Sequence, residues 1–315
     1  MTQTLAHRCA RAIGGGSSTF TADLHKALDT LGYASGNLQE RVNLATGLAG
    51  GAAWNAMLAW QIGTLGTQAK AIADLFGAGA HIWKPGIGTL SGIACNNFSD
   101  AAGTIPAVAD GVVANCSDAT TSGAIALSQA TGTQQPLVRS SGGLGWWECN
   151  SANNQGFACA SLPITMAADH AVIICASSTL GTGNRTLFGT AGAGTQRVAN
   201  LSIGVNISAT WRDDATTTVQ LVSLATRVNS PMVVGVRQVG QNRELRLDGV
   251  SLLGSSTPLG TTTLTGAAVG VLPNNTFSLP GNIYAAIVIS GTVTDDQMAL
   301  LEAYAANSAG VALAI

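Results

Sequence analysis

After "HIWKPGIG" (81–88) the chain changes to short, apolar-alternating runs separated by turn residues, and this pattern constrains the fold most. "HAVIICAS" (170–177) is followed by "RTLFGT", "RVANLSIGV", "TVQLVSLA" and "PMVVGVRQVG". A period of two places successive side chains on opposite faces of a strand. Many short strands at this spacing are typical of an all-β sandwich. We therefore predict a mainly β fold with two antiparallel sheets.

One of these strands concentrates charge in a chain of which only 10% of residues are charged. "RELRLDGVSL" (243–252) contains Asp248-Gly249, and both residues of such a turn favour positive φ. Residues 232–253 thus read as a three-stranded meander. Leu245 and Leu247 share one face of the middle strand, and Glu244, Arg246 and Asp248 share the other. We predict a solvated face that keeps an exposed strand soluble.

The chain ends with a short C-terminal helix. Thr294 and Gln297 form a capping box, Asp295 follows in the first turn, and Gly310 ends the helix. Helical spacing predicts a buried stripe of Met298, Leu301, Tyr304 and Ala305.

The first eighty residues have a different pattern, with short helical stripes interrupted by glycines. They predict an α-helical N-terminal segment over 1–82 and a separate sandwich domain over 83–315. Such helices form a poor core of their own, so we expect them to pack on other subunits. The expected anchoring or assembly residues are Leu24, Leu28, Leu31, Trp54 and Trp60. The uncharged stretch between Arg41 and Lys70 is long enough to span a membrane, but its five glycines and several amides favour burial in an assembly.

The order of motifs after residue 83 resembles a concanavalin A-like or laminin-G-like lectin domain. The motifs are "AVIICAS", "LFG", "VVGVRQVGQNRELRLDGVSL", "VGVLPNNTFSLPGNIYAAIVIS" and "TDDQMALLEAYAANSAG". Upstream, "LSQATGTQQP" (127–136) resembles the beginning of versions found in bacteriophage virion proteins. The resemblance implies a two-sheet jelly roll.

The resemblance also implies a function as a virion structural protein. On this hypothesis the N-terminal helices dock on the particle, and the sandwich projects from a tail fibre or baseplate or decorates the capsid. The expected partners are other virion proteins of the capsid, portal or tail and further copies of the chain, together with a host surface glycan. The expected location is the virion, assembled in the host cytoplasm.

A carbohydrate-binding module of an exported protein is the alternative, and a glycoside hydrolase is a third hypothesis. Trp146 and Trp147, in "GWWECN", could stack on a sugar ring, as could Trp211. Alternation favours burial of one member of the adjacent pair, and we expect Trp211 in the core as well. Glycosidases need two carboxyl groups across the scissile bond. Glu148 has no matching partner, and the neighbouring Asp213 and Asp214 should point to opposite faces, so we expect no enzymatic activity.

We also expect no metal, cofactor or nucleic acid. Asp118, Asn150, Asn154, Asp213 and Asp214 are oxygen donors but form no dense calcium-binding run. The net charge is −2, without a basic stripe that would bind nucleic acid. The six cysteines form no CxxC pair, so we expect them to be reduced and mostly buried. A disulfide between Cys149 and Cys159 is the alternative if the protein is exported.

Overall fold

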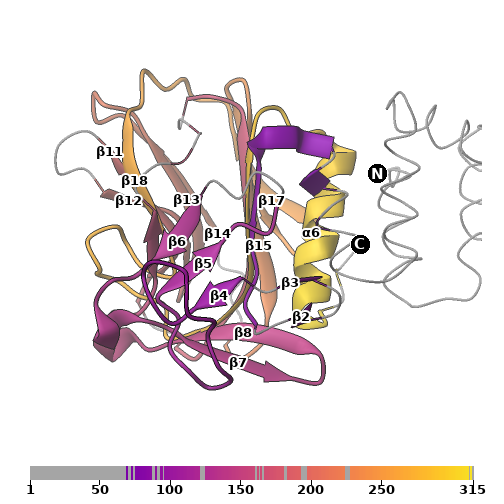
Figure 1. Cartoon of the computed structure of the whole chain (residues 1–315). Helices are drawn as coiled ribbons and strands as arrows, with labels where there is room; N and C mark the ends of the chain where they lie inside the picture. Colours follow the sequence, from indigo (N-terminus) through magenta and orange to yellow (C-terminus); the bar gives the residue numbers. More distant parts are fainter. Residues whose placement is uncertain are drawn as a thin grey trace, which may run out of the picture.

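The structure, a computed structural model, describes residues 75–86, 96–120, 125–159, 167–180, 183–192, 197–223 and 228–311. It also describes positions 69, 72, 73 and 313 and a few residues between these ranges. The fold is mainly β, with two antiparallel sheets and one C-terminal helix, as predicted (Figure 1).

We call the first sheet the helix-side sheet, because the C-terminal helix covers its outer face (Figure 1). Its strands run in the order β17-β16-β15-β10-β19-β8-β7, and β1 also pairs with β19. Their bounds are β1 Ala80–Trp83, β7 Leu137–Ser141, β8 Leu144–Cys149, β10 His170–Ser178, β15 Met232–Val239, β16 Asn242–Leu247, β17 Val250–Ser255 and β19 Gly281–Ser290.

The second sheet, here called the far sheet, has the order β14-β13-β12-β11-β18-β9-β6-β5-β4. Its strands are β4 Asn97–Phe98, β5 Asn115–Ser117, β6 Ala126–Ser128, β9 Phe157–Cys159, β11 Arg185–Gly192, β12 Arg197–Ile203, β13 Ile207–Arg212, β14 Thr218–Ser223 and β18 Leu264–Val269. The smaller elements are the strand pair β2 Thr89–Leu90 and β3 Ile93–Ala94 and the 3₁₀ turns η1 Gly77–Gly79, η2 Gly132–Gln134 and η3 Ser151–Asn153.

The central strands of the helix-side sheet are buried on both faces, under the far sheet on one side and the C-terminal helix on the other, so the molecule has three layers there. On β10, Val172 and Ile174 belong to the core between the sheets, whereas Ile173 and Cys175 belong to a second core under the helix. A strand that is buried on both sides reads as a continuous apolar run rather than an alternating one. This explains why "AVIICA" contains no polar residue.

The C-terminal helix α6 (Asp295–Ala309) forms as the sequence predicts. Both hydrogen bonds of the capping box between Thr294 and Gln297 are present, and Gly310 ends the helix with φ of 65°. The predicted stripe is fully buried against the helix-side sheet: Met298, Leu301, Tyr304 and Ala305.

The prediction for the charged strand was half right. The meander β15–β16–β17 forms, and Asp248 and Gly249 both have positive φ. The charged face, however, is not solvated: Arg246 and Asp248 are only 6% and 7% exposed, because α6 and the neighbouring turn cover them. The expected solubility face is therefore a buried contact between sheet and helix.

The end of the N-terminal segment packs on this same chain. Ala69 and Ile72 lie in the second core together with Leu301 of α6. The boundary predicted between residues 82 and 83 falls inside β1, which pairs with β19 from Ala80 to Trp83. The helices predicted before residue 69 lie outside the described residues, so these helices, their docking on other subunits and the division into two domains stay predictions. Among the described residues, no helix combines the length and the apolar character that crossing a membrane requires.

Candidate functional site

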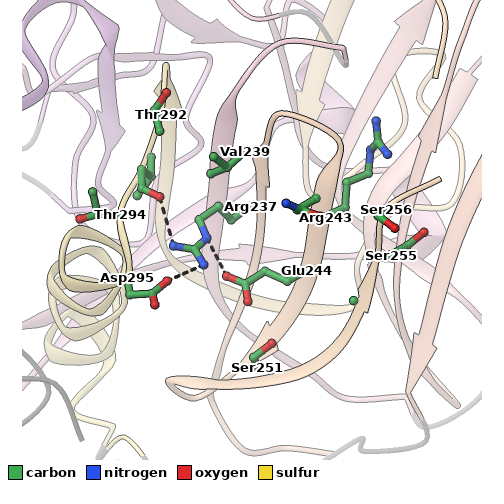
Figure 2. Close-up of a pocket in the computed structure, with 13 residues that line it drawn as sticks. Arg237, Val239, Arg243, Glu244, Ser251, Ser255, Ser256, Thr292, Thr294 and Asp295 are labelled. Atoms are coloured by element: carbon green, nitrogen blue, oxygen red, sulfur yellow. Dashed lines mark hydrogen bonds and ion pairs between the residues drawn. The ribbon is translucent and has the colours of Figure 1, made fainter. Parts of the chain in front are cut away.

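An open groove of about 770 Å³ lies where the N-terminal end of α6 meets β15, β16 and β17 (Figure 2). This volume is in the range of ligand-binding pockets in proteins. Most of the residues that line it are polar or charged, among them Arg237, Asn242, Glu244, Ser251, Thr294 and Asp295. The groove therefore offers hydrogen-bonding groups beside apolar surface.

Arg237 organises this groove by joining three elements. Its Nε lies 2.7 Å from Oε1 of Glu244, and its Nη2 lies 2.6 Å from Oδ1 of Asp295 (Figure 2). Its Nη1 donates to the carbonyl oxygen of Val293 at 3.1 Å. Arg237 and Glu244 are paired residues on adjacent antiparallel strands and so share a face, while the capping box places Asp295 in the first turn of α6. The guanidinium group of Arg237 and the carboxylates of Glu244 and Asp295 are thus held by one another.

A second ion pair lies deeper under the helix. Nε of Arg246 is 2.7 Å from Oε1 of Glu302, and the two side chains are 7% and 0% exposed. Nη2 of Arg246 donates to Oε2 of Glu302 at 3.1 Å and to the carbonyl of Gly249 at 2.9 Å. Burial alone would lower the pKa of Arg246, but the hydrogen bonds and charges of Glu302 and Glu244 outweigh it and raise the pKa. This pair fixes α6, and with it the wall of the groove.

Arg243 lies beside the groove, but its side chain extends away from Arg237 and Glu244 (Figure 2). It donates to Oε1 of Gln238 at 2.8 Å and to the carbonyl of Thr257 at 2.6 Å. Burial lowers its pKa. These bonds tie the segment after β17 to the sheet, so Arg243 supports the groove from behind.

The three predicted tryptophans have different environments. Trp147 is fully buried, packs against Phe157 at a centroid distance of 4.9 Å, and donates from Nε1 to Asn97. Trp211 is also in the core and is 1% exposed. As alternation predicts, only one ring of the adjacent pair is in the core. Trp146 is half-buried and is the one predicted tryptophan with an accessible ring surface.

Trp146 and Tyr284 form an aromatic pair on the outer face of the helix-side sheet. Their centroids are 6.2 Å apart and their planes are tilted by 43°. On the strands around them, Nε of Arg139 lies 2.7 Å from Oε2 of Glu148, and Asn282 donates to the hydroxyl of Tyr284 at 3.4 Å. The only sequence signal for this cluster was the Trp-Trp pair, because Tyr284 lies far along the chain.

The carboxylates and amides that were considered for calcium or catalysis serve local structure. Asp118 accepts hydrogen bonds from the backbone of Ile82 and Thr120 and lies 2.7 Å from Nδ1 of His81. Asp213 accepts from the backbone N–H groups of Gly260 and Thr217, and these bonds, that from Gly260 above all, lower its pKa.

The remaining candidates of this kind also have local partners. Asp214 binds Thr263, Asn150 caps η3, and Asn154 adopts φ of 50° at the end of η3. Within the described residues, no group of three or more His, Cys, Asp or Glu side chains is placed to hold a metal ion.

The remaining predicted residues have simple outcomes. Cys116, Cys149, Cys159 and Cys175 are buried and form no disulfide, so Cys149 and Cys159 are not bridged to each other. The anchoring candidates Leu24, Leu28, Leu31, Trp54 and Trp60 lie outside the described residues.

The sequence did not predict the groove itself. Arg237, Glu244 and Asp295 each appear in a segment that the sequence placed correctly. They come together only because α6, some fifty residues downstream of β16, packs across the sheet.

No protein-family model and no curated protein matches the sequence. Several solved structures are similar in fold. The carbohydrate-binding module CBM40 of the Ruminococcus gnavus IT-sialidase, bound to α2,3-sialyllactose, has a TM-score of 0.36 and 14% identity, over 43% of this chain and 83% of the module. The Trypanosoma rangeli sialidase has a TM-score of 0.42 and 10% identity, over 66% of this chain and 35% of the sialidase. The receptor-binding domain of botulinum neurotoxin type G has a TM-score of 0.39 and 11% identity, over 57% of this chain and 50% of that domain. These similarities concern the general sandwich fold alone.

Proposed function

We propose that this chain is a non-enzymatic, carbohydrate-binding β sandwich whose groove between α6 and β15–β17 holds a saccharide. The observation that carries the proposal is the groove of about 770 Å³, lined mostly by polar and charged residues, in which Arg237 holds the carboxylates of Glu244 and Asp295. A sugar presents many hydroxyl groups, each of which both donates and accepts hydrogen bonds. The carboxylates of Glu244 and Asp295 accept such bonds, and the side chains of Asn242 and Ser251 can both donate and accept them.

The rigid network favours binding because the groove loses little freedom when a ligand enters. Arg237 holds both carboxylates, so fewer side-chain rotamers need to be ordered on binding. The same arrangement disfavours hydrolysis. A glycosidase places two carboxyl groups across the scissile bond, whereas Glu244 and Asp295 converge on one guanidinium group.

The pair of Trp146 and Tyr284 is a separate candidate contact for a sugar ring. Aromatic side chains that are partly exposed offer apolar faces for stacking, and Glu148 and Asn282 lie close enough to orient hydroxyl groups. We assign it a secondary role because neither Trp146 nor Tyr284 lines the groove.

A glycan array followed by calorimetry tests the proposal. Ser251 is exposed, so Ser251→Trp should fill the groove without disturbing the core and should abolish binding. Ser140→Trp is the matched control, because Ser140 is exposed on β7 at the other edge of the same sheet. Wild-type protein that binds no saccharide, or Ser251→Trp that binds as well as Ser140→Trp, would contradict the groove assignment. Loss of binding in Trp146→Ala alone would move the site to the aromatic pair.

A virion structural protein is the second candidate function, and the ordered motifs of the sequence favour it. A glycan-binding sandwich fits this role as well, because host adhesion needs a recognition surface. Deletion of residues 1–80 tests the anchoring part: if the truncated chain still enters particles, the N-terminal helices are not the anchor.

A further inference from the structure

Within the described part of the chain, the edge strand β14 (Thr218–Ser223) of the far sheet shows none of the features that normally protect a sheet edge. Its sequence, TVQLVS, contains no charged residue and no proline. Its register with β13 is unbroken over six pairs, from Ile207↔Ser223 to Arg212↔Thr218. Natural proteins usually protect edge strands with charge, proline, bulges or covering loops, because a bare edge pairs readily with another strand.

The other three strands at the ends of the two large sheets, β17, β7 and β4, are each protected. A bulge interrupts β17 where it pairs with β16. On β7, Arg139 is bound to Asp110 and Glu148, and Leu137 forms a bridge with Val112. On β4, Phe98 forms a bridge with Pro106. The contrast indicates that β14 is left open for pairing.

The side chains and backbone of β14 suit a further strand. Val219 and Leu221 face the core, whereas Thr218, Gln220 and Val222 are exposed. From Thr218 to Val222, none of the described residues supplies a backbone partner on the side away from β13. Exposed apolar side chains lie close by, because β14 is in contact with β17, which exposes Val250 and Leu253.

We propose that β14 pairs with β14 of a second copy, antiparallel about a two-fold axis, and so joins the far sheets of two subunits. Paired residues in an antiparallel ladder lie on the same face, so the axis must pass through a residue. With the axis at Gln220, Gln220 of one copy faces Gln220 of the other. Val219 then faces Leu221 of the partner subunit, and the apolar layer continues across the junction.

A second copy fits the edge of β14 better than an unrelated peptide, and two properties of the strand show why. The strand matches its own copy in this register, with apolar residues facing apolar residues and amide facing amide. Because it carries no charge, the close approach of two identical strands brings no like charges together. Such an isologous contact closes on itself and gives a dimer rather than a fibre.

Light scattering coupled to size exclusion, with the full chain, tests the dimer. Gln220→Lys places two ammonium groups opposite each other and should weaken dimerisation by more than about tenfold. Ser140→Lys, an equal change on the edge strand β7, should leave the dimer intact. A wild-type chain that is monomeric at about 100 µM, where specific complexes are normally formed, would overturn the proposal. Dimerisation that Gln220→Lys does not weaken would overturn it equally.

A disulfide tests the register. Gln220→Cys places two thiols across the axis at a spacing that a disulfide spans, so mild oxidation should give a covalent dimer. Wild type and Ser140→Cys should stay uncrosslinked under the same conditions. If Gln220→Cys gives no more covalent dimer than Ser140→Cys, the β14 pairing is wrong. None of these measurements uses a glycan, so their outcome is independent of the groove proposal.

Discussion

Replacing Glu302 by glutamine should destabilise the protein strongly, because it leaves the buried guanidinium of Arg246 without its main counter-charge. The carboxylate makes two bonds to Arg246, at 2.7 Å and 3.1 Å, and its side chain is fully buried. Breaking a buried ion pair by removing one partner costs about 3–5 kcal/mol. Glutamine keeps one acceptor oxygen, and Glu244 remains 3.4 Å from Arg246, so we expect the lower end, about 3 kcal/mol.

Urea unfolding followed by both far-ultraviolet circular dichroism and tryptophan fluorescence measures this loss, with an unchanged m-value as a requirement. Glu148→Gln is the matched control. Glu148 also lies 2.7 Å from an arginine, but its side chain is 47% exposed, so that its removal should cost at most about 1 kcal/mol. The double variant Arg246→Met with Glu302→Leu should recover most of the lost stability, because it removes both charges. Equal losses in Glu302→Gln and Glu148→Gln would refute the reasoning that burial sets the energy of these pairs.

Three further predictions concern buried residues of the helix-side sheet. Gly281→Ala should lower the free energy of unfolding by about 3 kcal/mol or more, since its Cβ would lie 2.0 Å from the backbone oxygen of Ser177; Gly132→Ala, with open space around it, is the control in a thermal melt. Burial lowers the pKa of His170 from 6.5 to about 4, so the unfolded chain binds the proton first, and stability is full above pH 6.5 and decreases as the pH falls toward 4. The free energy of unfolding, measured by urea titration at each pH, should fall by about 3 kcal/mol over this range, and the fall should be smaller in His170→Gln. If the free energy of unfolding depends on pH equally in His170→Gln and in wild type, other groups cause the effect. Burial raises the pKa of Cys149 and Cys175 to about 12, so both should resist alkylation until the protein unfolds, as peptide mapping would show; labelling of either thiol in native protein would contradict their burial.

Features set by neighbouring residues were predicted well from the sequence. The Asp248-Gly249 turn depends on the φ angles of two residues, and the helix cap depends on Thr294 and Gln297, three positions apart. Alternation also predicted correctly that one ring of the pair Trp146 and Trp147 would be buried.

The candidate site was largely beyond sequence reasoning. Arg246 was placed on the correct strand and face, but that face was expected to meet water. Nothing within ten residues of Arg246 indicates that Glu302 will cover it. The sequence did not predict the groove for the same reason: its walls come from β15–β17 and from the start of α6, which are far apart in the chain.

The sequence by itself therefore determined the strands, the turns, the helix and its cap, since each depends on backbone preferences and side-chain periodicity within a few residues. Only the tertiary structure decided which charges are buried, which tryptophan stays accessible, where the groove opens and which sheet edge is bare. Those properties depend on contacts between residues far apart in the chain, and solvent exposure is fixed only when the layers pack together.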